Sequence, residues 1–291
     1  MMVFKGSGTA IITPFDDDGV NYRTFGQLID YQINNGTDAL VVLGTTGEPS
    51  TMTDEEKSQV IEFAVDYVNG RIPVIAGVGT NNTATCIKNA KVAASIGADA
   101  LLVVTPYYNK CTQKGLVQHY YAIADSTDLP VIVYNVPSRT GLNILPQTYL
   151  ELSKHPNIVA IKEACGNIEQ ICKTAALVKD KMAIYSGDDA CILPVLALGG
   201  MGVISVVANA VPNLISNLCK SFFEGDLQTA QELQFKILPL FEVLFSEVSP
   251  IPVKAAMNLL GFDCGVPRLP LTESENKEKI LSELKKLIPN L

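Results

Sequence analysis

The stretch Ile158-Val159-Ala160-Ile161-Lys162-Glu163-Ala164-Cys165-Gly166 joins a short apolar run to a lysine and a turn of small residues. Such a run indicates a buried strand, and period-two alternation predicts that Ile158, Ala160 and Lys162 share one face. Burial at the end of a strand favours the neutral amine, which is the nucleophilic form of lysine. A lysine can also mark the point where a strand reaches solvent, so the rest of the chain must decide.

Apolar runs of similar length recur through the first two-thirds of the chain. They predict eight strands, near 8–12, 39–43, 73–77, 100–105, 131–135, 158–162, 183–186 and 203–207. Helix-length segments such as 24–34 and 55–69 separate them, and continuous apolar strands are typical of parallel sheets covered on both faces. This order predicts an α/β fold, a closed (β/α)8 TIM barrel.

Two local signals support the predicted helix boundaries. The segment 36–42 resembles 97–103, and in both the leading glycine suits the end of a helix before a strand. Thr53 with Glu56 fits a capping box at the start of a helix. The spacing of the two similar segments, about two βα units, agrees with a repeating barrel.

After the eighth strand the pattern predicts helices only. They are expected near 212–223, 227–245, 253–260 and 273–288, the last opened by a capping box of Thr272 and Glu275. We therefore expect a catalytic barrel over 1–224 and a C-terminal helical extension over 225–291. The extension is expected to pack on the outer side of the barrel or to form part of a subunit contact.

Composition narrows the class of protein. The chain has 291 residues, 47% of them hydrophobic, and a formal net charge of −8, which argues against nucleic acid or an anionic membrane as partner. No signal peptide and no membrane span are expected from the N-terminus or the apolar runs. Seven scattered cysteines without a Cys-x-x-Cys pair indicate reduced thiols in the cytoplasm, and two isolated histidines predict no metal site.

Catalytic residues of such barrels follow the C-terminal ends of the strands. The chemically active residues expected there are Thr45, Thr46, Tyr107, Tyr108, Tyr134, Arg139, Lys162, Asp188 and Asp189. This set is rich in hydroxyl groups and lacks histidine, which suits imine chemistry better than metal-assisted enolization.

Each of these residues has a candidate role. Lys162 would attack a ketone, Tyr134 would carry protons, and Thr45 with Tyr108 would complete a hydrogen-bonded relay. Arg139 has the planar fork that holds a carboxylate through two bonds.

Structural roles remain open for the same residues. The pair at 107–108 could be an aromatic plug, Arg139 a surface ion-pair residue, and the segment 44–48 a tight turn with a cap. The acidic pair at 188–189 is expected to cap the following helix rather than bind a metal.

Three motifs together carry a resemblance. Gly44-Thr45-Thr46-Gly47-Glu48, Tyr134-Asn135-Val136-Pro137 and Ile161-Lys162-Glu163 occur in the order typical of the pyruvate-dependent class I aldolases, the family of the N-acetylneuraminate lyases and dihydrodipicolinate synthases. The resemblance covers essentially the whole chain. It implies a TIM barrel whose lysine forms an imine with pyruvate, with no metal or organic cofactor, and a homotetramer built as a dimer of dimers.

The resemblance also assigns roles to single residues. It implies that Lys162 forms the imine, that Tyr134 transfers protons, and that Thr45 links it to Tyr108 from a neighbouring subunit. Arg139 would hold the carboxylate of the second substrate. The pocket for pyruvate and this substrate would be lined by Thr46 and by backbone at Gly187 and Ile204.

Two features favour the synthase branch of this family. They are the pair Thr45-Thr46, where sialate lyases have Ser-Thr, and the arginine of the segment 137–141. They imply condensation of pyruvate with L-aspartate 4-semialdehyde in diaminopimelate and lysine biosynthesis, by a lyase of the carbon–oxygen class. The alternatives are a lyase of N-acetylneuraminate or of a 2-keto-3-deoxy sugar acid, and a barrel retained as a binding protein.

One departure concerns feedback regulation. Synthases of this family that lysine inhibits have an acidic residue where this chain has Thr85. Without that carboxylate the ligand's ammonium loses a charge-assisted contact, typically about 1.5–3 kcal/mol. The sequence therefore predicts weak or absent inhibition by lysine.

Overall fold

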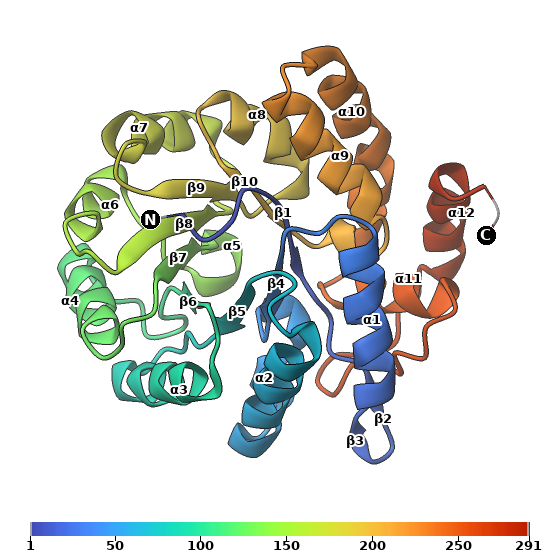
Figure 1. The fold of residues 1–291 in the computed structure, drawn as a ribbon, viewed down its shortest axis with the longest axis horizontal. Coiled ribbons are helices and arrows are strands. Elements are labelled where there is room, and N and C mark those ends of the chain that lie inside the picture. Colours follow the sequence, from blue (N-terminus) through green and yellow to red (C-terminus); the bar gives the residue numbers. More distant parts are fainter. Residues whose placement is uncertain (1, 290) are drawn as a thin grey trace.

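The computed structural model describes residues 2–289 and 291 and shows a closed barrel of parallel strands surrounded by helices (Figure 1). The barrel strands are β1 (Gly6–Ala10), β4 (Ala39–Val42), β5 (Val74–Gly77), β6 (Ala100–Val104), β7 (Val131–Asn135), β8 (Ile158–Glu163), β9 (Ala183–Ser186) and β10 (Gly202–Ser205). Each strand pairs with the next in sequence, and β10 closes on β1. The predicted (β/α)8 fold is confirmed.

Helices alternate with these strands and then continue alone. The helices are α1 (Tyr22–Asn34), α2 (Asp54–Val68), α3 (Thr83–Ile96), α4 (Gln113–Ala124), α5 (Pro137–Thr140), α6 (Pro146–Leu152), α7 (Ile168–Val178), α8 (Ile192–Ala197), α9 (Pro212–Phe223), α10 (Leu227–Leu244), α11 (Ile251–Leu259) and α12 (Lys277–Leu287). The short elements are β2 (Phe15–Asp16), β3 (Gly19–Val20) and the single-turn helices η1 (Thr45–Gly47), η2 (Pro49–Thr51), η3 (Asp189–Cys191) and η4 (Val207–Asn209). In Figure 1 the orange and red helices α10–α12 lie on one side of the barrel, beside α9 and α1.

The interior of the barrel is packed rather than hollow. Phe4, just before β1, stacks on Tyr185 of β9 with ring centroids 4.2 Å apart, and the Tyr185 hydroxyl donates to the Phe4 carbonyl at 2.6 Å. A Cβ at Gly8 would lie 2.7 Å from the Phe4 ring, so glycine makes room for it. The N-terminal end of the barrel is therefore filled, and chemistry is left to the opposite end.

The strand β1 begins at Gly6, two residues before the predicted 8–12. The missed start consists of Gly6, Ser7 and Gly8, which have low intrinsic preference for strands. Two of these positions need glycine in the folded barrel, because a Cβ at Gly8 would meet the Phe4 ring and a Cβ at Gly6 would meet the Asp38 carboxylate.

A bulge resets the alternation of β8. Val131 of β7 pairs with Ile158 and the next residue of β7 pairs with Ala160, which leaves Val159 as the extra residue. Val159 and Ala160 both belong to the cluster inside the barrel, whereas Ile158 belongs to the cluster beneath the helices. The prediction that Ile158 shares a face with Ala160 and Lys162 is therefore wrong.

Three of the four predicted helix boundaries are confirmed. The capping box of Thr53 and Glu56 opens α2, and Gly36 and Gly97 follow the last turns of α1 and α3 in the left-handed conformation. The fourth is wrong, because α12 begins at Lys277 and lacks the box of Thr272 and Glu275. The Glu275 N–H instead donates to Glu247 at 3.0 Å, so an inter-segment bond replaces the local cap.

Residues 2–289 and 291 contain no helix of sufficient length and apolarity to cross a membrane.

Candidate active site

A cavity of about 470 Å³ opens at the C-terminal ends of the barrel strands. It is lined by Thr45, Thr46, Tyr134, Val136, Ser138, Arg139, Lys162, Ala164, Gly187, Asp188, Val206, Phe241, Phe245, Glu247, Val248 and Ser249. A smaller hollow of about 200 Å³ adjoins it and shares Thr45, Tyr134, Val136 and Arg139. Folding thus brings most of the predicted site residues to one place.

Lys162 near the end of β8 places its amine in this cavity. Its side chain is buried, and its Nζ lies 4.2 Å from the centroid of the Tyr134 ring. Loss of water lowers the pKa of Lys162 to about 7, an effect that Asp189 opposes and Arg139 reinforces. A large fraction of the amine is therefore neutral near pH 7 and able to act as a nucleophile.

The acidic pair after β9 has structural bonds. Asp188 accepts the Ala190 N–H at 3.0 Å and caps η3, as predicted. Asp189 is buried and accepts the Ser205 hydroxyl and the Val206 N–H, so it fastens the segment after β10. The described part of the chain contains no cluster of three or more His, Cys, Asp or Glu suited to a metal ion.

Tyr134 lies opposite Lys162 on the neighbouring strand β7. Burial raises the pKa of its phenol, while Arg139 and a polar contact from Thr45 act in the opposite direction. The phenol is therefore protonated at neutral pH, and it lies beside the amine with which it would exchange protons. Thr45 comes from the turn η1 directly after β4.

Gly187 allows the segment after β9 to approach the lysine closely. Its N–H donates to the Glu163 carbonyl at 2.7 Å. A Cβ at this position would lie 2.9 Å from the Ala164 Cβ and 3.1 Å from the Lys162 Cγ. Glycine is thus required for the packing of Lys162, which extends the predicted backbone role.

Arg139 lies at the rim on α5, which starts two residues after β7. Its Nη2 donates to the Ser249 carbonyl at 3.1 Å, and its side chain lines both hollows. A guanidinium has five N–H donors, so this bond leaves others for a carboxylate.

Two predicted site residues lie elsewhere in this single chain. Tyr108 is 90% exposed with a positive φ of 72°, and it lines neither hollow, whereas Tyr107 lines the smaller one. Ile204 is buried in the barrel interior and does not line the cavity either. The role of Tyr108 in a neighbouring subunit stays a prediction.

The C-terminal extension contributes cavity residues that the sequence analysis did not foresee. They are Phe241 of α10, Phe245, and the residues 247–249 that connect α10 to α11. The sequence analysis expected the extension to pack on the outer side of the barrel or to form part of a subunit contact, and it named no cavity residue from this segment. The only signal in the sequence is the break in helical pattern near residue 249, and this break does not predict that the segment lines the cavity.

The chain is similar to known proteins over nearly its whole length. The chain matches the model of the dihydrodipicolinate synthetase family over residues 3–290. It is 55% identical to the 4-hydroxy-tetrahydrodipicolinate synthase of Thermoanaerobacter sp., covering 95% of this chain and 94% of the relative. The crystal structure of dihydrodipicolinate synthase from Thermotoga maritima superposes with a TM-score of 0.97 at 44% identity, covering 100% of both chains. The Acinetobacter baumannii enzyme, crystallised with pyruvate, gives a TM-score of 0.94 at 44% identity over 98% of each chain.

Proposed function

The chain belongs to the dihydrodipicolinate synthetase family, and on that premise we propose that it condenses pyruvate with L-aspartate 4-semialdehyde, the reaction of 4-hydroxy-tetrahydrodipicolinate synthases. The observation that carries the proposal within the site is Lys162, a buried amine with a pKa of about 7 beside the Tyr134 phenol. The high identity over nearly the full chain to relatives of that name favours this reaction over sialate or sugar-acid cleavage.

The chemistry follows from the neutral amine. Lys162 adds to the keto carbon of pyruvate, and loss of one water from the carbinolamine gives the imine. Tyr134 donates and recovers the protons of these steps. Removal of a methyl proton then yields an enamine whose carbon attacks the aldehyde of the second substrate, and the aldehyde oxygen takes up one proton to become a hydroxyl. Attack of the substrate's own amino group on the imine carbon then closes the ring and releases Lys162 as the free amine.

The other cavity residues would orient the substrates. Thr46 and the backbone of Gly187 would contact pyruvate; in support, both residues line the cavity that contains Lys162. Arg139 at the rim would hold the carboxylate of the semialdehyde through its free N–H donors. Ile204 would act only through its backbone, since its side chain fills the barrel.

The relay would be completed by a second subunit. Tyr108 is 90% exposed on its own chain, whereas the hollow of about 200 Å³ beside Thr45 and Tyr134 lies open. We propose that Tyr108 of the partner subunit enters this hollow, in a homotetramer built as a dimer of dimers. Dimerisation would then form part of the catalytic site.

We further propose a carbon–oxygen lyase that uses no metal or organic cofactor and works in the cytoplasm. The covalent imine supplies the electron sink that a cofactor would otherwise provide. All seven cysteines are free in the described residues, and a reducing compartment keeps them so.

The decisive experiment traps the imine. The protein is incubated with pyruvate, reduced with borohydride and digested, and the modified peptide is identified by mass. An adduct on Lys162, absent from Lys162→Ala and present in the exposed-lysine control Lys154→Ala, is the expected result. An unmodified Lys162 would refute the mechanism, and turnover of N-acetylneuraminate but not of the semialdehyde would reassign the substrate.

A further inference from the structure

A completely buried ion pair lies beneath the turn that carries Thr45 and Thr46. Lys254 of α11 contacts Glu48 with Nζ and Oε1 2.8 Å apart, and both side chains have 0% exposure. The other carboxylate oxygen of Glu48 accepts the backbone N–H of Arg268 at 3.0 Å. The C-terminal extension thus supplies both partners of a carboxylate that follows β4.

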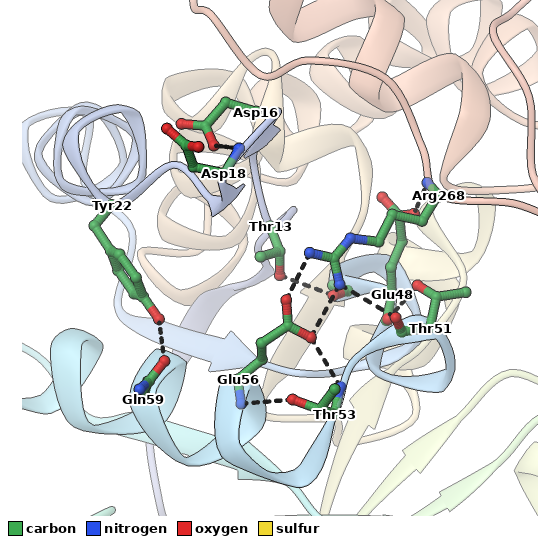
Figure 2. A network of polar contacts seen from close by, with 11 residues as sticks. Thr13, Asp16, Asp18, Tyr22, Glu48, Thr51, Thr53, Glu56, Gln59 and Arg268 are labelled. Carbon is green, nitrogen blue, oxygen red and sulfur yellow. Dashed lines mark hydrogen bonds and ion pairs between the residues drawn. The ribbon is translucent and has the colours of Figure 1, made fainter.

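The Arg268 side chain binds the segment that follows this turn, at Thr51 and Glu56. Its guanidinium binds both oxygens of Glu56 at 3.0 and 2.6 Å, and it also donates to the Thr51 carbonyl at 3.2 Å. Figure 2 shows this arrangement, with Glu56 receiving Arg268 on one side and Thr53 on the other. The start of α2, the turn η2 and the extension are therefore joined by one polar network.

Phe15 provides an apolar wall for the two cations. The Lys254 Nζ lies 4.0 Å from its ring centroid and the Arg268 Cζ lies 4.1 Å away. Cation–π contact of this kind is strongest where water is excluded. The ring therefore helps to keep the Lys254 ammonium against Glu48 and the Arg268 guanidinium against Glu56.

The turn held by this pair has a backbone that needs outside support. Glu48 is in the left-handed region with φ 56°, and its N–H closes η1 by donating to the Thr45 carbonyl at 3.2 Å. Leu43, on the other side of the turn, also has a positive φ of 55°. Non-glycine residues keep such conformations where the surrounding structure determines them, and they concentrate at functional sites.

Stability alone does not explain a buried ion pair here. Well-packed apolar residues of similar volume often serve a core at least as well, whereas ionic groups fix geometry. Resting on the proposed function, we infer that Glu48 and Lys254 are positioning residues: they hold η1 so that the Thr45 hydroxyl meets the Tyr134 phenol. They touch no substrate, and they act on turnover through Thr45.

The test is a double-mutant cycle between this pair and Thr45. The charge-free pair Glu48→Gln with Lys254→Met is made in the unchanged protein and in the Thr45→Val background. Glu48→Asp, which keeps both charges but shortens the carboxylate by one methylene, is made in both backgrounds as well. Glu273→Gln with Lys277→Met removes an exposed ion pair of the same extension and serves as the control.

Turnover number, KM for pyruvate and borohydride trapping are measured for each protein, with circular dichroism for the fold. We expect the charge-free pair to lower kcat about 10- to 100-fold while Lys162 still forms its imine, since small misplacements of a catalytic group have effects of that size. In the Thr45→Val background the same change should lower kcat much less, because the partner through which it acts is already gone. The exposed-pair control should keep normal kcat.

The inference would be overturned if the charge-free pair lowered kcat by the same factor with and without Thr45→Val. It would also be overturned if the charge-free pair had a normal kcat. Unfolding of both Glu48 variants would also overturn it, because the pair would then serve stability. These outcomes differ from failure of the proposed function, which would show as absent imine trapping in the unchanged protein.

Discussion

The Nζ of Lys162 lies 4.2 Å from the centre of the Tyr134 ring, and the two residues occupy paired positions on the adjacent strands β8 and β7. A ring face attracts an ammonium, yet the pKa of Lys162 is lowered to about 7 because removal from water outweighs that attraction. The positions of the proposed nucleophile and the proposed proton carrier are thus set by strand register rather than by flexible loops, which is how precise sites are built.

The rate of imine formation should rise with pH and level off above about pH 7, because only the unprotonated amine of Lys162 reacts and its pKa is about 7. Asp189 raises this pKa, so Asp189→Asn should shift the midpoint to lower pH. The rate of borohydride-trapped adduct against pH measures both. A midpoint near 10.5, the ordinary value for lysine, would contradict the burial argument.

Gly187→Ala should slow imine formation about 10- to 100-fold without unfolding the protein, because the new Cβ would lie 3.1 Å from the Lys162 Cγ and displace the amine. Gly115→Ala on α4 is the matched control, since its nearest atom would be 3.3 Å away and its φ is not positive. Single-turnover trapping with pyruvate separates the two variants. Equal rates would show that the segment after β9 moves to accommodate the new Cβ and leaves the Lys162 amine in position.

Arg139→Lys should raise KM for the semialdehyde and lower kcat/KM about 10- to 100-fold, since it keeps the charge but loses the two-pronged grip on a carboxylate. Trapping with pyruvate alone should be unchanged, because the positive charge that lowers the pKa of Lys162 remains. Steady-state kinetics with each substrate varied in turn provide the check. A selective rise in KM for pyruvate would show that Arg139 binds pyruvate rather than the semialdehyde.

Tyr108→Phe should lower kcat although the residue is 90% exposed on its own chain, because its hydroxyl would act in the partner's site. Mixing Tyr108→Phe subunits with Lys162→Ala subunits should restore activity that neither has alone. Each hybrid pair contains one site with an intact lysine and an intact borrowed tyrosine. Absence of recovery after verified subunit exchange would place Tyr108 outside the relay.

Lysine should inhibit weakly or not at all, because Thr85 stands where inhibited relatives have a carboxylate. Thr85→Glu should increase sensitivity to lysine. The substitution should be tolerated, because Thr85 lies in the first turn of α3 and the N-terminus of a helix favours negative charge. Inhibition curves for the two proteins measure the effect. An inhibition constant at or below the submillimolar range in the unchanged protein would contradict it.

Local patterns predicted the barrel because most strands contain a short apolar run and the helix-length segments between them have apolar residues at helical spacing. They also predicted that Lys162, Tyr134, Thr45 and Arg139 lie at the C-terminal end of the barrel, because each residue lies at or after the end of its strand in the sequence. The bulge at Val159 was not predicted, because an extra residue does not change the sequence pattern of a run in which every residue is apolar. The start of α12 was misplaced because Glu247, from another segment, binds the residue that the expected cap would have used.

Long-range partners explain the remaining misses. Nothing beside Glu48 in the sequence indicates that its carboxylate meets Lys254, and nothing beside residue 249 indicates that its carbonyl meets Arg139. Tyr108 is recognisable by residue type, yet the place proposed for it lies in the site of a second chain. Residues of this kind are chosen by the assembled fold, which a local pattern does not contain.

The Glu48–Lys254 pair has a consequence for how the protein is made. Its two members are 206 positions apart, and Arg268 follows later still. On the ribosome, the barrel strands emerge first, and the turn with Thr45 waits without its supporting ammonium until nearly the whole chain has been synthesised. A nascent chain that already contains every proposed catalytic residue therefore still lacks the support proposed for Thr45, and full activity is expected only after the residues up to 268 have folded onto the barrel.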